Sequence, residues 1–110
     1  MSTPSPVLHQ YEVIAGITRR MLVEAHANHW DQVVVLGEEY QQAVEALRGI
    51  DTLSSEDRAA RLALLTQILD DDAHIRQLAS PELSRLGALL GDMKRQHTVL
   101  QAYCTPSLTL

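Results

Sequence analysis

Apolar positions near the end of the chain recur at alternating intervals of three and four residues. The stripe consists of Leu83, Leu86, Leu90, Met93, His97, Leu100 and Cys104. This alternation keeps side chains on one narrow face of an α-helix and is the geometry of a helix-bundle seam. Leu89, Val99 and Tyr103 widen the stripe on one side. Such a helix needs partner helices, from its own chain or from another.

Three earlier segments show the same helical spacing and are long enough to supply those partners. Together with the last stripe, the pattern predicts four helices, over residues 6–27, 29–48, 55–79 and 81–104. Short connections force neighbouring helices to run antiparallel. We therefore expect an all-α fold: a single domain over residues 1–110, built as an antiparallel up-and-down bundle of four helices with a short C-terminal tail.

Residues typical of helix ends occur at the predicted boundaries. Pro6 follows a serine, as at a helix start, and Asn28 is placed to cap the second helix. Gly49 is suited to end that helix, and Ser54 begins a capping box for the third. Pro81 is expected to separate the third helix from the fourth.

Composition and charge exclude several classes of protein. The net charge is −5, which argues against a general nucleic-acid-binding protein. No run of 18 apolar residues is present, so we expect no membrane insertion. The N-terminus lacks a secretory pattern, and the single Cys104 cannot form an internal disulfide. These features favour a cytoplasmic protein.

Charge is also uneven along the chain. Residues 28–50 carry one basic side chain against four acidic ones, and residues 51–79 carry three against six. Residues 80–110 carry three against two. The middle of the chain is therefore acidic, which favours either an ordinary solvated surface or the steering of a basic partner.

No catalytic, cofactor-binding or metal site is expected. His26 and His29 have metal-like spacing only if one helix runs through Asn28, and the capping pattern argues against that. The acidic run 70–72 is consecutive on a predicted helix, unlike the alternating ligands of a calcium loop. Cys104 has no activating neighbours in the sequence. The chain is therefore not expected to be an enzyme.

Two polar residues fall on apolar helical faces. Asp72 lies within the stripe of the third predicted helix, where an unpaired carboxylate is costly to bury. Either Arg76, one turn later, pairs with it, or that face remains open to water. His97 is expected to share its ring proton with a backbone carbonyl. Gly87 and Gly91 suggest a close helix contact.

Four stretches, in this order, resemble FliT-type flagellar export chaperones. Trp30-Asp31, with the acid-rich helix around Tyr40, resembles the second helix of that family. The third helix is matched by residues 68–78, ILDDDAHIRQL, and the start of the fourth by residues 82–86, ELSRL. Residues 100–103, LQAY, are similar to the segment near the end of the family's sequences.

The resemblance implies a cytosolic chaperone that binds the C-terminal region of the filament-cap protein FliD. It would prevent premature assembly of FliD and deliver it to the type III export apparatus, whose export ATPase components would be further partners. In some relatives the free chaperone also binds FlhC within FlhDC and represses class 2 flagellar transcription. A regulator of that kind, or a self-associating structural module such as a homodimer, are the alternatives.

The apolar residues outnumber those that the main seams need, and a surplus left exposed would form a binding surface. We predict a partner-binding groove along the second and third helices, which would receive an amphipathic client helix. Its residues are Leu64, Leu65, Ile68, Asp72, Ile75 and Leu78. The last helix would cover part of this groove when the client is absent, and Leu89, Val99 and Tyr103 are the predicted latch or dimer surface.

Overall fold

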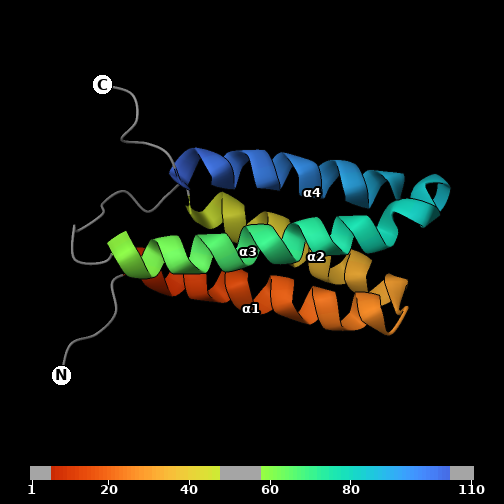
Figure 1. Ribbon diagram of the computed structural model, residues 1–110, viewed down its shortest axis with the longest axis horizontal. Helices are drawn as coiled ribbons and strands as arrows, with labels where there is room; N and C mark the ends of the chain where they lie inside the picture. The colour runs from red at the N-terminus through yellow and green to blue at the C-terminus, as the bar shows by residue number, and fades with distance from the viewer. Residues whose placement is uncertain (1–5, 48–57, 105–110) are drawn as a thin grey trace.

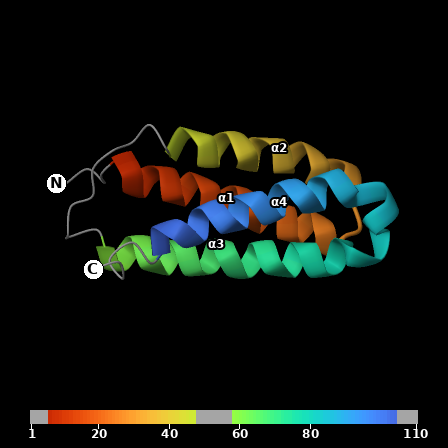
Figure 2. The same cartoon turned by 90° about the horizontal axis from the view of Figure 1, so that it is seen from above.

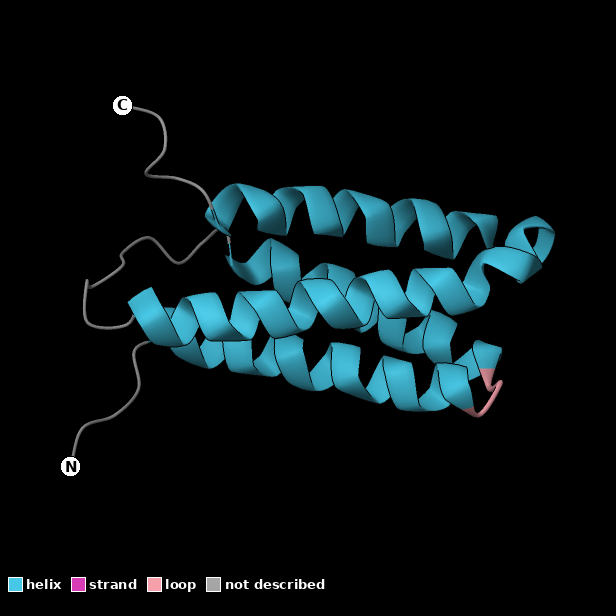
Figure 3. Ribbon diagram, in the orientation of Figure 1, coloured by secondary structure: helices cyan, strands magenta, loops and turns pink. Residues whose placement is uncertain are grey.

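A computed structural model describes residues 6–47 and 58–104 of the protein, and this part of the chain is helical without strands (Figure 3). The elements, in order, are α1 (Pro6–His26), α2 (Trp30–Leu47), α3 (Arg58–Ala79), the 3-10 turn η2 (Ser80–Glu82) and α4 (Leu83–Cys104). The predicted all-helical class is confirmed. No loop separates α3, η2 and α4, so the chain stays helical from α3 to α4 while it folds back on itself (Figure 1).

The turn between α1 and α2 differs from the prediction at Asn28. This residue has a left-handed backbone conformation, with φ of 67°. Its amide donates to the carbonyl of Ala25 at 3.0 Å, and the amide of His29 donates to that of Glu24 at 2.9 Å. These two bonds form a Schellman motif, so Asn28 ends α1 rather than capping α2. Its side-chain Oδ1 accepts the indole N–H of Trp30 at 2.7 Å.

Other predicted helix ends fall partly on the described residues. Pro6 is the first residue of α1. Gly49 and Ser54 lie outside the described residues, as do the predicted start of a helix at residue 55 and the predicted tail over residues 105–110.

The reversal between α3 and α4 is built from two local irregularities. Pro81 lies in η2, where its ring favours a new first turn and prevents α3 from continuing. A second departure from helical geometry occurs at Leu86, with φ of −110° and ψ of 19°. The start of α4 is therefore kinked.

The core is arranged around α1, which packs against both α2 and α3. Helix α4 packs against α3 and α2, and Figure 1 shows it on the opposite side of α3 from α1. Figure 2 shows the same four helices lying roughly along one direction. The largest fully buried side chains come from all four: Tyr11, Ile14, Met21, Val33, Tyr40, Val44, Leu47, Leu65, Ile68, Ile75, Met93 and Leu100.

Gly37 marks a close approach between α2 and α4. A Cβ atom at this position would lie 2.7 Å from Cδ1 of Leu89 on α4. The absence of a side chain therefore lets α4 settle onto α2 here. Gly87 and Gly91 do not have the predicted role, because both are exposed and a Cβ atom on either would meet nothing within 4 Å.

Candidate partner-binding site beneath helix α4

The six residues predicted to line a groove are largely enclosed. Leu65, Ile68, Asp72 and Ile75 are completely buried, whereas Leu64 and Leu78 are half-buried. All six lie on α3, between α1 on one side and α4 on the other. The predicted residues thus lie largely in the interior of the molecule and do not line an open groove.

The predicted latch or dimer residues lie on α4 and are used within the chain. Leu89 is buried against the close approach at Gly37, and Val99 is half-buried against the core. The side chain of Tyr103 lies outside the described part. Leu89 and Val99 therefore help to attach α4 to the other helices, which leaves little of them for a second copy.

A buried polar network joins α2, α3 and α4. The hydroxyl of Tyr40 on α2 donates to Oδ2 of Asp72 on α3 at 2.6 Å. Nε of Arg76, one turn along α3, donates to the other oxygen, Oδ1, also at 2.6 Å. Of the two alternatives that the sequence left open for Asp72, the structure has the pairing with Arg76. We call Tyr40, Asp72, Arg76 and His97 the polar network.

His97 supplies the contact from α4. Because an arginine can only donate, Nη2 of Arg76 donates to Nδ1 of His97, over 3.2 Å. The same ring nitrogen lies 3.5 Å from Oδ1 of Asp72. These two side-chain neighbours of Nδ1 on α3 were not foreseen from the sequence. The predicted bond from the ring proton to a backbone carbonyl would involve the other ring nitrogen, Nε2, and stays a prediction.

Burial raises the pKa of the Tyr40 hydroxyl far above its ordinary value, and the neighbouring Asp72 carboxylate raises it further. Tyr40 therefore remains a hydrogen-bond donor in the folded protein. Tyr40 was not among the residues predicted to form a site. The available signal was a tyrosine on the apolar stripe of its helix, because a buried hydroxyl needs a partner.

The raised pKa of the Tyr40 hydroxyl predicts that the protein loses stability at alkaline pH. Above the ordinary tyrosine pKa of about 10, the unfolded chain releases a proton that the folded chain retains at Tyr40. The contribution is fully present below that pH and lost as the pH rises beyond it. Urea unfolding at about pH 9 and pH 11 is expected to show a steeper loss in the wild type than in Tyr40→Phe. An equal fall in the free energy of unfolding from about pH 9 to pH 11 in the two proteins would contradict the raised pKa of Tyr40.

Asp71, next to the polar network, faces α1. Its Oδ2 lies 3.3 Å from Nε of Arg19, and the residue is buried. Burial raises the pKa of the Asp71 carboxyl, and the charge of Arg19 opposes that rise. No separate role was predicted for Asp71 within the acidic run. It nevertheless lies three residues after Ile68 and four before Ile75, a spacing that could have placed it on the buried side.

The raised pKa of Asp71 gives a prediction of the same sign as that for Tyr40, but at acidic instead of alkaline pH. The folded state binds this proton more tightly than the unfolded chain, so acidification favours folding at this site. As the pH falls towards the ordinary aspartate pKa of about 3.9, the wild type is expected to gain free energy of unfolding relative to Asp71→Asn. Denaturant titrations of both proteins across this range measure the difference. A difference that stays constant or shrinks would refute the prediction.

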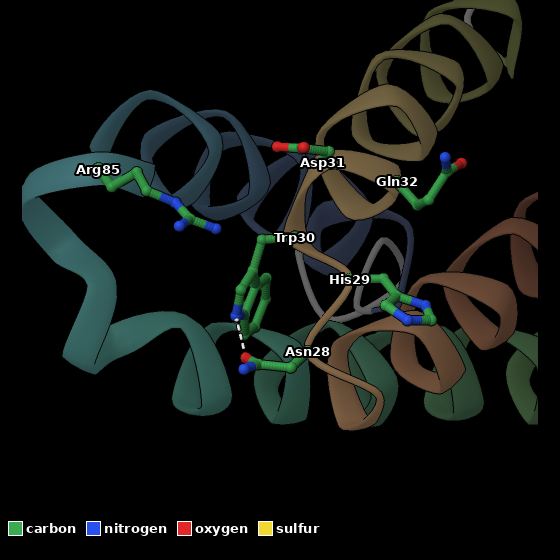
Figure 4. A pocket seen from close by; sticks show the side chains of 6 residues that line it. All are labelled: Asn28, His29, Trp30, Asp31, Gln32 and Arg85. Atoms are coloured by element: carbon green, nitrogen blue, oxygen red, sulfur yellow. Dashed lines mark hydrogen bonds between the residues drawn. The ribbon is translucent and has the colours of Figure 1, made fainter.

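Two surface hollows follow one another where α2 faces α4. The first, of about 450 Å³, lies where the α1–α2 turn approaches the start of α4 (Figure 4). The second, of about 230 Å³, continues between α2 and α4 and shares Arg85 with the first. We call them together the α2/α4 furrow; its lining includes Trp30, Asp31, Val34, Glu38, Arg85 and Asp92.

Figure 4 shows the Arg85 side chain reaching from α4 towards Trp30, whose indole is tied to Asn28. Arg85 thus stands where the two hollows of the furrow meet, and the furrow also carries acidic Asp31, Glu38 and Asp92. Asp92 itself is paired with Arg95. Because α4 forms one wall, the furrow depends on α4 being in place.

Within residues 6–47 and 58–104, no group of three or more histidine, cysteine, aspartate and glutamate side chains is arranged to hold a metal ion. In the same part of the chain, no helix combines the length and apolar character needed to cross a membrane.

The chain resembles known proteins of one family. The family model described as "Flagellar protein FliT" matches residues 8–105. Among curated relatives, flagellar protein FliT of Yersinia enterocolitica is 34% identical over 101 residues, covering 88% of this chain and 83% of the relative. Flagellar protein FliT of Pectobacterium carotovorum is 26% identical over 106 residues, with coverages of 94% and 84%.

A solved structure shows the same relationship. The crystal structure of flagellar protein FliT from Bordetella bronchiseptica is 46% identical and has a TM-score of 0.63. The match covers 77% of this chain and 100% of that one. The resemblance seen in the sequence is thereby confirmed, and the chain belongs to the FliT family of flagellar proteins.

Proposed function

We propose that this protein is a cytoplasmic flagellar export chaperone for the cap protein FliD. It binds the C-terminal region of FliD, prevents premature assembly and delivers FliD to the type III export apparatus, where export ATPase components are its further partners. Membership of the FliT family supports the flagellar setting. The observation that carries the binding role is the position of α4, which covers buried apolar surface of α3 from one side of the molecule.

The proposal treats α4 as the fourth helix of an antiparallel up-and-down bundle and as a latch that can leave it. Helix α1 packs against both α2 and α3, so each of these two helices retains its packing on α1 without α4. Helix α4 is joined to α3 by a 3-10 turn and is kinked at Leu86, positions at which a helix can reorient. Detaching α4 would expose the groove predicted on α3.

An amphipathic helix of FliD would then occupy the place of α4. Helix-in-groove binding inserts apolar side chains spaced three and four residues apart, the pattern that α4 itself presents. The client must bind the open form tightly enough to offset the free energy that the packing of α4 contributes to the closed form. In the closed form these apolar side chains stay shielded, which limits binding of unrelated proteins.

A labelled peptide from the C-terminal region of FliD tests this role. Fluorescence anisotropy is expected to show saturable binding at micromolar concentration, weakened by Leu78→Ala on the half-buried side of α3. Val23→Ala is the control, because Val23 is 59% exposed on α1 and belongs to neither proposed surface. Absence of peptide binding to the wild type at these concentrations would reject the proposed function.

Regulation of transcription through FlhC in FlhDC is the second candidate, and the α2/α4 furrow favours it. This furrow exists only while α4 is seated, so a partner bound there would recognise the client-free chaperone. Pull-down of FlhC with the full chain is expected to succeed without the FliD peptide and to fail after Arg85→Glu. Arg20→Glu, an exposed change on α1, is the matched control. Equal recovery with both variants would count against the furrow.

Self-association into a homodimer is the remaining alternative. Val35 and Leu83 are 51% and 61% exposed, so apolar surface is available on α2 and at the start of α4. Light scattering with and without the FliD peptide measures the molecular mass of the particle in solution. A mass that stays at one chain in both states would exclude the dimer.

A further inference from the structure

We propose that the client helix is selected for a neutral hydrogen-bond acceptor on its apolar face, which replaces His97 opposite Arg76. This inference rests on the proposed function, because it assumes that the client occupies the place of α4. It adds a requirement that apolar packing alone does not impose. The occupant is a helix of the cap protein, and the chemistry that marks it is one polar side chain within an apolar stripe.

The part of the polar network that remains after α4 leaves is already fixed. Tyr40 and Asp72 are completely buried, and each Asp72 oxygen accepts one hydrogen bond, from Tyr40 or from Arg76. These three residues belong to α2 and α3, so their hydrogen bonds to one another do not involve α4. Departure of α4 removes only the acceptor of Arg76 Nη2, the His97 ring nitrogen at 3.2 Å.

Arg76 therefore presents a directed donor to whatever covers α3. Its side chain is 25% exposed beneath α4, and that of His97 is 21% exposed, so the pair is largely withdrawn from water. A client helix with an entirely apolar stripe would cover Nη2 without offering an acceptor. Covering a donor in this way costs binding free energy, whereas supplying the acceptor avoids the loss.

The charges around the position of His97 limit which side chain of the client can serve as the acceptor. A lysine or arginine at the position of His97 would face the Arg76 guanidinium and be repelled. A carboxylate there would lie near the buried charge of Asp72, whose Oδ1 is 3.5 Å from the present Nδ1. A neutral acceptor, such as histidine, asparagine, glutamine, serine or threonine, meets neither repulsion. The site thus favours an uncharged polar side chain.

Helix α4 also gives the spacing expected around that acceptor. On either side of His97, buried apolar residues lie four positions before, at Met93, and three after, at Leu100. A further one, Leu86, lies eleven positions before it. The client segment is therefore expected to carry apolar residues at these offsets from its neutral polar residue.

The experiment is a double-mutant cycle with the full chain and the FliD C-terminal peptide. Neutral polar peptide residues with apolar neighbours four before and three after are replaced singly by alanine. One replacement is expected to weaken binding to the wild type about tenfold, the scale of one lost buried hydrogen bond. Its effect on Arg76→Lys is expected to be about twofold or less, because lysine keeps the charge beside Asp72 but lacks the second donor group of the fork.

A second pair of variants tests the same point from α4. His97→Leu removes the acceptor of the latch, so α4 competes less well and the wild-type peptide is expected to bind several-fold more tightly. His97→Asn keeps an acceptor and is expected to bind as the wild type does. The inference would be overturned if the peptide binds but no peptide replacement has a smaller effect on Arg76→Lys than on the wild type. It would also be overturned if His97→Leu and His97→Asn bind the peptide with the same affinity. Either result would leave the chaperone role intact. Absence of all peptide binding would overturn both.

Discussion

Replacing Asp72 by alanine is expected to lower the free energy of unfolding by about 3 kcal/mol, at the lower end of the range for breaking a buried ion pair. The change leaves the Tyr40 hydroxyl without its acceptor and the Arg76 guanidinium without its carboxylate. A buried polar group without a partner has lost its hydration and gains no hydrogen bond in return. Removing one partner therefore costs far more free energy than the intact pair contributes to stability. Urea unfolding of the two proteins near neutral pH measures the difference.

Asp71→Ala is the matched control, since Asp71 is the adjacent residue and is also buried. Its Oδ2 faces Arg19, which is about half exposed, and burial raises its pKa, so its charged form is poorly accommodated. Alanine is therefore expected to cost much less here. A loss for Asp72→Ala no larger than that for Asp71→Ala would show that the polar network does not stabilise the fold.

Ile68→Ala and Ile75→Ala are each expected to lower the free energy of unfolding by about 2–5 kcal/mol, the usual cost of truncating a buried large aliphatic side chain. Both isoleucines are completely buried on α3. The loss combines apolar surface no longer buried with a cavity that the neighbouring helices fill only in part. Thermal or urea unfolding measures it directly.

Leu62→Ala on the same helix is the comparison, because Leu62 is 47% exposed. Its expected effect is within about 0.5 kcal/mol, as for most surface substitutions. Equal effects at Ile68 and Leu62 would mean that α3 is not packed as described. The burial also means that weaker client binding by Ile68→Ala would combine instability of the fold with a smaller client-binding surface, which is why Leu78 is the better binding probe.

Much of the helical fold could be predicted from spacing alone. The intervals of three and four residues indicate which faces are apolar, and Pro6 stands where α1 begins. The pairing of Asp72 with Arg76 was one of two outcomes foreseen, because a one-turn spacing brings the two side chains together.

Other features, local and tertiary, could not be predicted in this way. Asn28 suits both a helix start and a left-handed helix end, and the Schellman bonds that decide between them involve residues before and after it. The partner of His97 lies 21 positions away along the chain, on a neighbouring helix. The number of apolar residues likewise does not say whether α4 covers α3 or leaves it open.

The central claim is that α4 is a latch whose place is taken by the client. Hydrogen exchange of the α4 amides, followed by mass spectrometry with and without saturating FliD C-terminal peptide, tests it most directly. The account predicts that amides of α4 exchange faster when the peptide is bound, while those of α3 become more protected. Unchanged or slower exchange throughout α4 in the presence of bound peptide would contradict it.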